Sequence, residues 1–142
     1  QETTSEVSDV VQVGKVVGVE NDDDRQIEEL NVTMRLASGS DPINLSKASY
    51  TLQTNGMARV VSGNKGQAGI TYNEVQSLED TTIISDQEDL MVTTLDLEEI
   101  DGVQPLNDSW EFQIVVQAPA GGQSYSALET PRRIFEGESY IL

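Results

Sequence analysis

The sequence predicts an all-β domain, an immunoglobulin-like β-sandwich or a Greek-key barrel, over residues 12–142. Apolar residues recur at every second position in several short segments, which is the period of half-buried strands. Turn-forming residues separate these segments at roughly regular intervals, as they do in sandwiches and barrels. The length of 142 residues is enough for one domain with its own core.

The first eleven residues differ from the rest of the chain. They contain no turn residues, and Val7, Val10 and Val11 stand at helical spacing. Residues 1–11 are therefore predicted to be the end of a truncated N-terminal helix or a linker, with a disordered terminus as the alternative. The chain opens on Gln1 without a signal-peptide pattern, so we expect either that a signal was removed or that this is part of a longer protein.

Six segments are predicted to be strands. They are residues 10–19, 31–37, 48–54, 89–97, 109–118 and 139–142. In the second, Val32, Met34 and Leu36 are expected to face inward and Asn31, Thr33 and Arg35 outward. The clearest alternation is in the fifth, with Trp110, Phe112, Ile114, Val116 and Ala118 on one face and Glu111, Gln113 and Gln117 on the other.

Turn signals lie between these strands, at residues 20–24, 38–42, 55–56, 62–66, 100–102 and 119–122. Asn55-Gly56 is the strongest of them, because this dipeptide favours the positive φ angles of a type I′ hairpin turn. Residues 62–66 hold a lysine among glycines but lack the spacing of a phosphate-binding loop, so they too are predicted to be a hairpin loop.

The charge balance restricts the partners. The chain has 25 acidic and 8 basic residues and a formal net charge of −17, which disfavours nucleic acid and anionic membranes as partners. Basic residues are scarce along the whole chain, as in proteins adapted to high salt; an ordinary acidic extracellular domain is the alternative. No apolar run reaches the ~18 residues that crossing a bilayer needs.

The absence of cysteine and histidine argues against an enzyme. It removes disulfides, thiol chemistry, the usual hydrolase triads and zinc sites built on these residues. The acidic residues of 101–108 could suggest the paired carboxylates of a glycosidase, but one Trp and few other aromatic residues leave little to bind a sugar.

Three N-x-Ser/Thr motifs are candidate glycosylation sites, at Asn31, Asn44 and Asn107. We expect glycans there if the protein is extracellular and its host glycosylates; otherwise the three asparagines are ordinary surface amides. Asn31 is expected to point outward from its strand, which favours it as an acceptor.

Acidic clusters occur at Asp22–Asp24, from Glu79 to Asp89, and from Asp96 to Asp101. The first lacks the spacing and glycine of an EF-hand loop, so it is predicted to be a solvated turn. In the second, acidic residues flank a short apolar run, so Glu79 or Asp80 could approach Asp86 and Asp89. The alternative for this cluster is a repelling acidic surface.

Four segments, in this order, resemble the head domain of archaellins, the filament subunits of the archaeal motility organelle. Residues 2–18 are similar to the family's junction between its long N-terminal helix and first strand. The loop and strand "ASGSDPINLSKASYTL" at 37–52 resemble the family pattern A-G-S-x-P-I-D-L and the strand after it. Residues 84–97 resemble a later strand, and residues 110–142 resemble the closing hairpin and the C-terminal pattern carried by Pro131, Ile134, Gly137 and Leu142.

The resemblance implies a structural, non-catalytic role as the outer domain of a filament subunit at the archaeal cell surface. Its partners would be other archaellin subunits, and such heads are often N-glycosylated. Some heads hold a metal ion, so the resemblance implies a calcium or magnesium site at Glu79, Asp80, Asp86 and Asp89. Two departures stand out. The hydrophobic N-terminal helix is absent, and Glu88 replaces the glycine of the usual G-D turn.

Two other readings remain open. One is an accessory archaellum protein or another pilin-like or surface-layer-binding β-sandwich. The second is an extracellular module that binds an ion or a carbohydrate.

Overall fold

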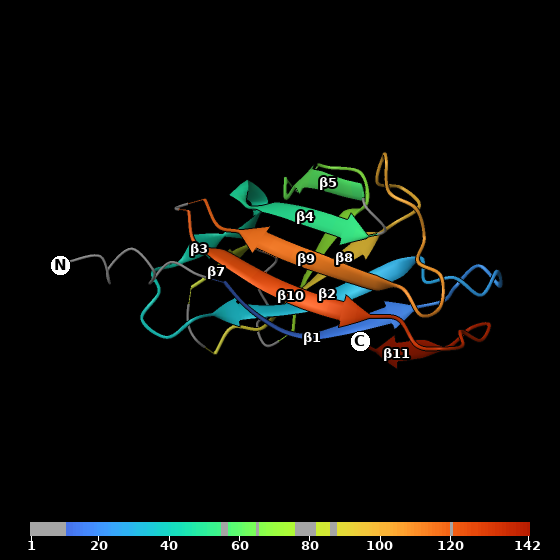
Figure 1. The fold of residues 1–142 in the computed structure, drawn as a ribbon. Coiled ribbons are helices and arrows are strands. Elements are labelled where there is room, and N and C mark those ends of the chain that lie inside the picture. The colour runs from blue at the N-terminus through green and yellow to red at the C-terminus, as the bar shows by residue number, and fades with distance from the viewer. Residues whose placement is uncertain (1–10, 55–56, 65, 76–81, 86–87, 120) are drawn as a thin grey trace.

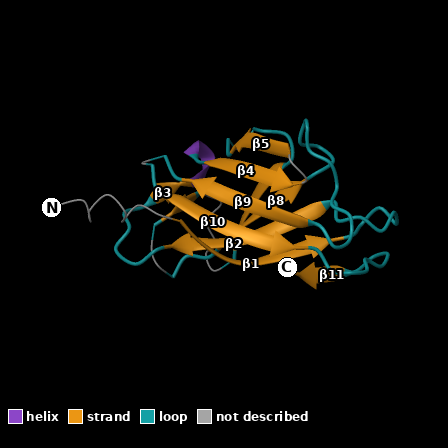
Figure 2. Ribbon diagram, in the orientation of Figure 1, coloured by secondary structure: helices purple, strands orange, loops and turns teal. Residues whose placement is uncertain are grey.

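The protein is a two-layer β-sandwich in the computed structural model, which describes residues 11–54, 57–64, 66–75, 82–85, 88–119 and 121–142 (Figure 1). The elements are β1 Val11–Val19, β2 Glu29–Leu36, β3 Ile43–Asn44, the 3₁₀ turn η2 Leu45–Lys47, β4 Ser49–Thr54, β5 Met57–Ser62, β6 Ile70–Glu74, β7 Ile83–Ile84, β8 Met91–Asp96, β9 Glu111–Gln117, β10 Gln123–Glu129 and β11 Ser139–Ile141. Strands dominate the described chain, as Figure 2 shows. The predicted all-β sandwich is confirmed.

The layers are two antiparallel sheets. The first has the order β11-β1-β2-β8-β6, the second β10-β9-β4-β5, and a short β3-β7 pair lies beside them. Across the described part of the chain, no helix reaches the length and apolarity that crossing a membrane requires.

The predicted alternation holds where it was strongest. In β2, Val32 and Met34 are fully buried, while Asn31 and Thr33 are half-buried and lie on the outer side. In β9, Phe112, Ile114 and Val116 are buried and the residues between them are more exposed. These inward side chains from both sheets form one core, which is the main stabilising feature of the fold.

Several elements differ from the sequence prediction. Five strands lie outside the six predicted segments. β3 and β7 have two residues each, β5 is an edge strand in which only Val61 is buried, β6 is an edge strand of the other sheet, and β10 pairs with β9. Val11 begins β1, so the last residue of the predicted N-terminal helix is in fact strand; residues 1–10 lie outside the described residues. The Asn55-Gly56 turn also lies outside them, and Thr54 pairs with Met57 on either side of it, as a two-residue hairpin loop requires.

Two tyrosines form a hydrogen-bonded network inside the core. The Tyr72 hydroxyl lies 2.6 Å from the Gly63 carbonyl oxygen and 3.0 Å from that of Leu45. The hydroxyl of the fully buried Tyr50 lies 3.2 Å from the Tyr72 hydroxyl and 3.4 Å from the Thr93 hydroxyl. Burial raises the pKa of Tyr72 well above its ordinary value, so the hydroxyl stays protonated and donates. The network joins β6 to the opposite sheet.

We expect Tyr72→Phe to destabilise the fold by about 1–3 kcal/mol, because it removes the hydroxyl donor that lies 2.6 Å from the Gly63 carbonyl oxygen. Urea unfolding measures the change. Tyr125→Phe is the matched control, because Tyr125 is 64% exposed on β10 and its hydroxyl should contribute little. Equal effects of the two substitutions would contradict the proposed role of the network.

Candidate functional site

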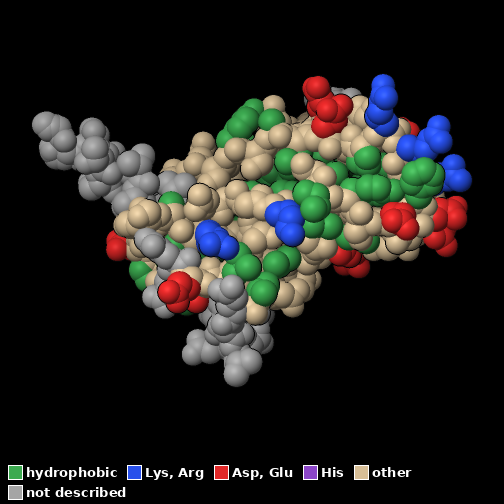
Figure 3. Space-filling view, turned by 90° about the horizontal axis from the view of Figure 1, so that it is seen from below, with side chains coloured by type: hydrophobic (Ala, Val, Ile, Leu, Met, Phe, Trp, Pro, Cys, Tyr) green, Lys and Arg blue, Asp and Glu red, His purple; other side chains and the backbone are tan. Residues whose placement is uncertain are grey.

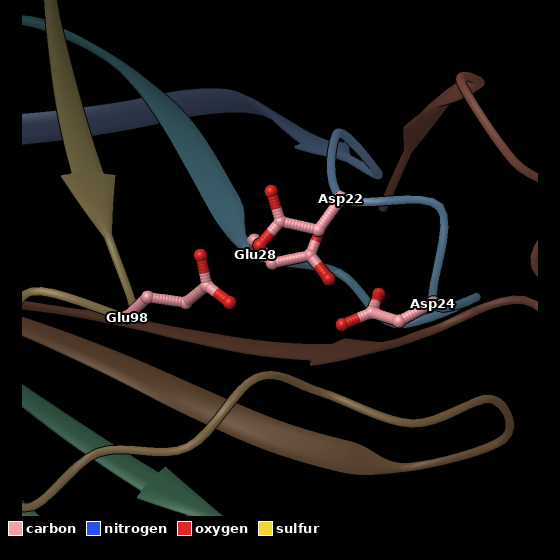
Figure 4. Close-up of side chains that lie close together, drawn as sticks. All are labelled: Asp22, Asp24, Glu28 and Glu98. Carbon is pink, nitrogen blue, oxygen red and sulfur yellow. The ribbon is translucent and has the colours of Figure 1, made fainter.

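Four carboxylates meet at one end of the sandwich, where β1 passes into β2 and β8 ends (Figure 4). Asp22 and Asp24 lie in the loop between β1 and β2, Glu28 directly precedes β2, and Glu98 follows β8 by two residues. One carboxylate oxygen from each lies within 4.8 Å of the others. We call these four residues the acidic cluster. Figure 3 shows that most charged side chains on the face seen from below lie toward this end.

A fifth carboxylate, that of Glu20, holds the β1–β2 loop in place through hydrogen bonds to its backbone. Glu20 is 1% exposed, and one of its oxygens accepts hydrogen bonds from the backbone N–H groups of Asp24 (2.7 Å) and Arg25 (2.8 Å). The other oxygen accepts from the Gly137 N–H at 2.8 Å. Glu20 thus holds the β1–β2 loop against the connection between β10 and β11. In this loop, Asp23 and Arg25 adopt left-handed φ angles of 58° and 62°.

Glu28 is the buried member of the cluster, 1% exposed. Its Oε1 accepts a hydrogen bond from the Asn21 N–H at 2.9 Å, whereas its buried Oε2 has no hydrogen-bond partner among the described residues. Burial raises the pKa of Glu28 to about 8, with a hydrogen bond to Asp24 and the charges of Asp24 and Glu20 adding to the effect. Two carboxylates can share a hydrogen bond only when a proton lies between them. Without a bound cation, Glu28 therefore needs that proton.

A second carboxylate pair behaves in the same way. A hydrogen bond with Asp22 raises the pKa of Glu98 to about 7, and one with Glu28 lowers the pKa of Asp24. Among the described residues, no Lys or Arg side chain forms an ion pair with any member of the cluster. The arrangement thus concentrates negative charge with no fixed counter-charge, and its carboxylate oxygens are of the kind that hard cations prefer.

The metal residues predicted from the resemblance lie elsewhere. Glu79, Asp80 and Asp86 are outside the described residues, so their prediction stays untested. Asp89 is half-buried and accepts a hydrogen bond from the Ser85 N–H at 3.0 Å. Asp89 precedes β8 and Glu98 follows it, so the two lie at opposite ends of that strand.

The three sequon asparagines are half-buried, and each amide oxygen accepts hydrogen bonds. Asn31 accepts from the Thr94 hydroxyl at 2.6 Å and donates to the Glu29 carboxylate at 3.0 Å. Asn44 caps η2 by accepting from the Ser46 N–H at 3.1 Å, and Asn107 accepts from the Gln26 side chain at 2.7 Å. Asn31 lies on the outer side of β2 as expected, and glycosylation of all three stays a prediction.

Sequence reasoning predicted a solvated turn at Asp22–Asp24 and missed the cluster. One signal was present: Glu28 stands two residues before Leu30 and so has the phase of the inward-facing residues of β2. A carboxylate in phase with a buried face indicates a special environment. Glu98 carried no comparable signal. It stands 70 positions after Glu28, and the two approach each other only because β2 pairs with β8.

We expect Glu28 to make stability fall as pH rises, measured in chelator. Its folded pKa of about 8 lies above the ordinary value of 4.5, so its contribution is complete below pH 4.5 and lost as pH rises through 8. Glu28→Gln keeps the donor that a proton supplies, so we expect this variant to melt several degrees above wild type at pH 8 but not at pH 4.5.

The exposed Glu136→Gln is the control for removal of one negative charge. If both variants change melting temperature alike at every pH, Glu28 has no special protonation, and the predicted pH dependence is wrong.

The sequence and the fold were compared with those of known proteins. No family model matches the sequence. Flagellin B1 of Natrialba magadii is 23% identical over 151 aligned positions, which cover 99% of this chain and 74% of that protein.

Among solved structures, archaeal flagellin FlaB1 of Methanocaldococcus jannaschii superposes with a TM-score of 0.72 at 14% identity, covering 91% of this chain and 98% of that one. A subunit of the Methanospirillum hungatei archaeal flagellum gives 0.68 at 10% identity, covering 93% of this chain and 74% of that one. The periplasmic stator protein FlaG of Sulfolobus acidocaldarius gives 0.54 at 13% identity, with 83% and 97% covered.

Proposed function

We propose that this chain, which has the sequence character and the fold of an archaellin head domain, is the outer part of a structural subunit of an archaeal motility filament. The observation that carries the proposal is the agreement of two comparisons. A flagellin aligns along 99% of the chain in sequence, and an archaeal flagellin of known structure is covered to 98% of its length by the same fold. The role is structural and needs no catalytic residues.

The outer face of the β10-β9-β4-β5 sheet is the surface we assign to contacts between neighbouring subunits. Strand pairing aligns its outward residues in three rows across the four strands. In the order β5, β4, β9, β10 the rows are Ser62, Ser49, Gln117 and Gln123; Val60, Thr51, Val115 and Tyr125; and Ala58, Gln53, Gln113 and Ala127. We call these three rows the uncharged face. None of its side chains is ionised at neutral pH.

An uncharged face matters in a chain with a net charge of −17. Two copies that approach through charged surfaces repel each other, and like charges opposed across an interface cost several kcal/mol. The uncharged face lacks this repulsion. Its central row also exposes apolar surface, with Val60 66% and Tyr125 64% exposed. Apolar and amide side chains of this kind are suited to subunit contacts.

The remaining acidic surface suits a filament that extends into a saline medium. Salt at physiological strength screens charges beyond about 8 Å, which weakens repulsion between neighbouring heads. We place the domain outside the cell on this basis, with N-glycans at Asn31, Asn44 or Asn107 as a further proposal.

An accessory archaellum protein is the second candidate. It is favoured by the similarity to FlaG, which covers 97% of that stator protein. The TM-score of 0.54 is lower than the 0.72 found with archaeal flagellin, and the sequence relative is a flagellin. We therefore place this candidate second.

The direct test joins an archaellin-type N-terminal helix to the domain and examines the product by electron microscopy at high and low salt. We expect helical filaments of uniform width with this domain outside, and fewer or shorter filaments at low salt because repulsion is then unscreened. A monomer that never polymerises, even beside other archaellins, would favour the accessory role.

A second prediction tests the uncharged face. Val60→Asp places a carboxylate in the central row, so we expect the critical concentration for assembly to rise about tenfold or more. Val75→Asp is the matched control, because Val75 is 55% exposed but lies beyond β6, outside this face. If both variants assemble like wild type, the contacts lie elsewhere on the domain.

A further inference from the structure

We propose that the acidic cluster of Asp22, Asp24, Glu28 and Glu98 binds one calcium ion, which joins the β1–β2 loop to the connection after β8. Nothing in the resemblance to archaellins points to these residues. The inference is also independent of the proposed filament role, because all four ligands come from one chain and binding can be measured on the unassembled domain.

The buried oxygen of Glu28 is the main argument. Glu28 Oε2 is sealed from water and lacks a donor in the described structure. A buried polar atom without a partner is costly, and a buried carboxylate more so. Figure 4 shows the Glu28 carboxylate among those of Asp22, Asp24 and Glu98, so it faces further acceptors rather than donors. A cation between them satisfies all four groups at once.

The spacing of the oxygens fits a calcium shell. Calcium binds oxygen at about 2.3–2.6 Å, so opposite ligands of one ion lie roughly 4.6–5.2 Å apart. One oxygen from each carboxylate already lies within 4.8 Å of the other three. Magnesium binds at about 2.0–2.1 Å, demands near-ideal octahedral geometry and gives up its waters reluctantly, whereas calcium accepts several carboxylates in a flexible shell. Calcium is therefore the ion that we propose for four converging carboxylates.

The surroundings allow the ion to enter and complete its shell. Asp22, Asp24 and Glu98 are exposed, so water and their second oxygens can supply the remaining ligands. Glu20 is excluded as a ligand in this arrangement, because backbone N–H groups already occupy both of its oxygens. The site thus has one buried anchor and three ligands open to solvent.

The expected consequence is a clamp between distant segments. Glu28 and Glu98 flank paired strands, since Glu29 of β2 lies opposite Asp96 of β8. Asp22 and Asp24 belong to the loop that contains the left-handed Asp23 and Arg25. An ion held by all four would fix that loop to the sheet and neutralise part of the local charge.

The test is a titration of the chelator-treated domain with calcium alone at pH 7.5 in 1 M NaCl, which suppresses non-specific binding. We expect one ion per chain with a Kd on the order of 0.1–1 mM, as in extracellular calcium modules. At calcium a hundredfold above Kd, the melting temperature should rise by roughly 10 °C. Magnesium should give a smaller rise at the same concentration.

Variants locate the ion. Glu28→Gln should abolish saturable binding, and Glu98→Gln, which changes an exposed side chain and should fold normally, should weaken it at least about tenfold. Asp89→Asn is the control and should bind calcium as wild type does. The proposal is overturned if wild type shows no saturable binding, if both glutamine variants bind normally, or if only Asp89→Asn loses binding.

Discussion

The structure depends on where a strongly acidic chain places its carboxylates. With 25 acidic and 8 basic residues, few carboxylates can be neutralised by ion pairs, so most must face water. Among the described residues the buried core is apolar except for Glu20, Glu28, Thr93 and Thr130. Both buried acids lie at one end of the sandwich, beside the β1–β2 loop. The rest of the core can therefore pack without carboxylates.

That end is also where the first sheet is joined to the connection between β8 and β9. The Glu28 carbonyl accepts a hydrogen bond from the Leu97 N–H at 2.8 Å, and Ile27 pairs with Leu106 through two backbone hydrogen bonds. The side chains of Ile27, Leu97 and Leu106 are all buried. Glu20 and Glu28 thus lie at a junction whose neighbouring segments are held by packing and by backbone hydrogen bonds.

The sequence predicted what depends on local periodicity. The alternation in β2 and β9 placed Val32, Met34 and Ile114 inward correctly, because a buried sheet face imposes period two on the chain. The sequence predicted the hairpin turn that leads into β5 but not the bounds of that strand, because an exposed edge imposes almost no pattern on the chain. Nor could it predict the acidic cluster in full, because contact between Glu28 and Glu98 follows from the pairing of β2 with β8. Pairing partners are a property of the whole fold, and local spacing does not encode them.

A net charge of −17 opposes the proposed polymerisation, and the distribution of charge over the surface reconciles the two. Coulomb repulsion in water falls with distance and is screened by salt, so it matters most where surfaces touch. The uncharged face offers a surface at which touching brings no carboxylates together, although Glu111 and Glu129 border it at one end. The acidic cluster lies apart from that face, on the loops of the opposite sheet, where its charge keeps chains soluble without opposing contact. Under the proposed filament role, separating charge from the contact surface would let one small domain repel non-specifically and still associate through the uncharged face.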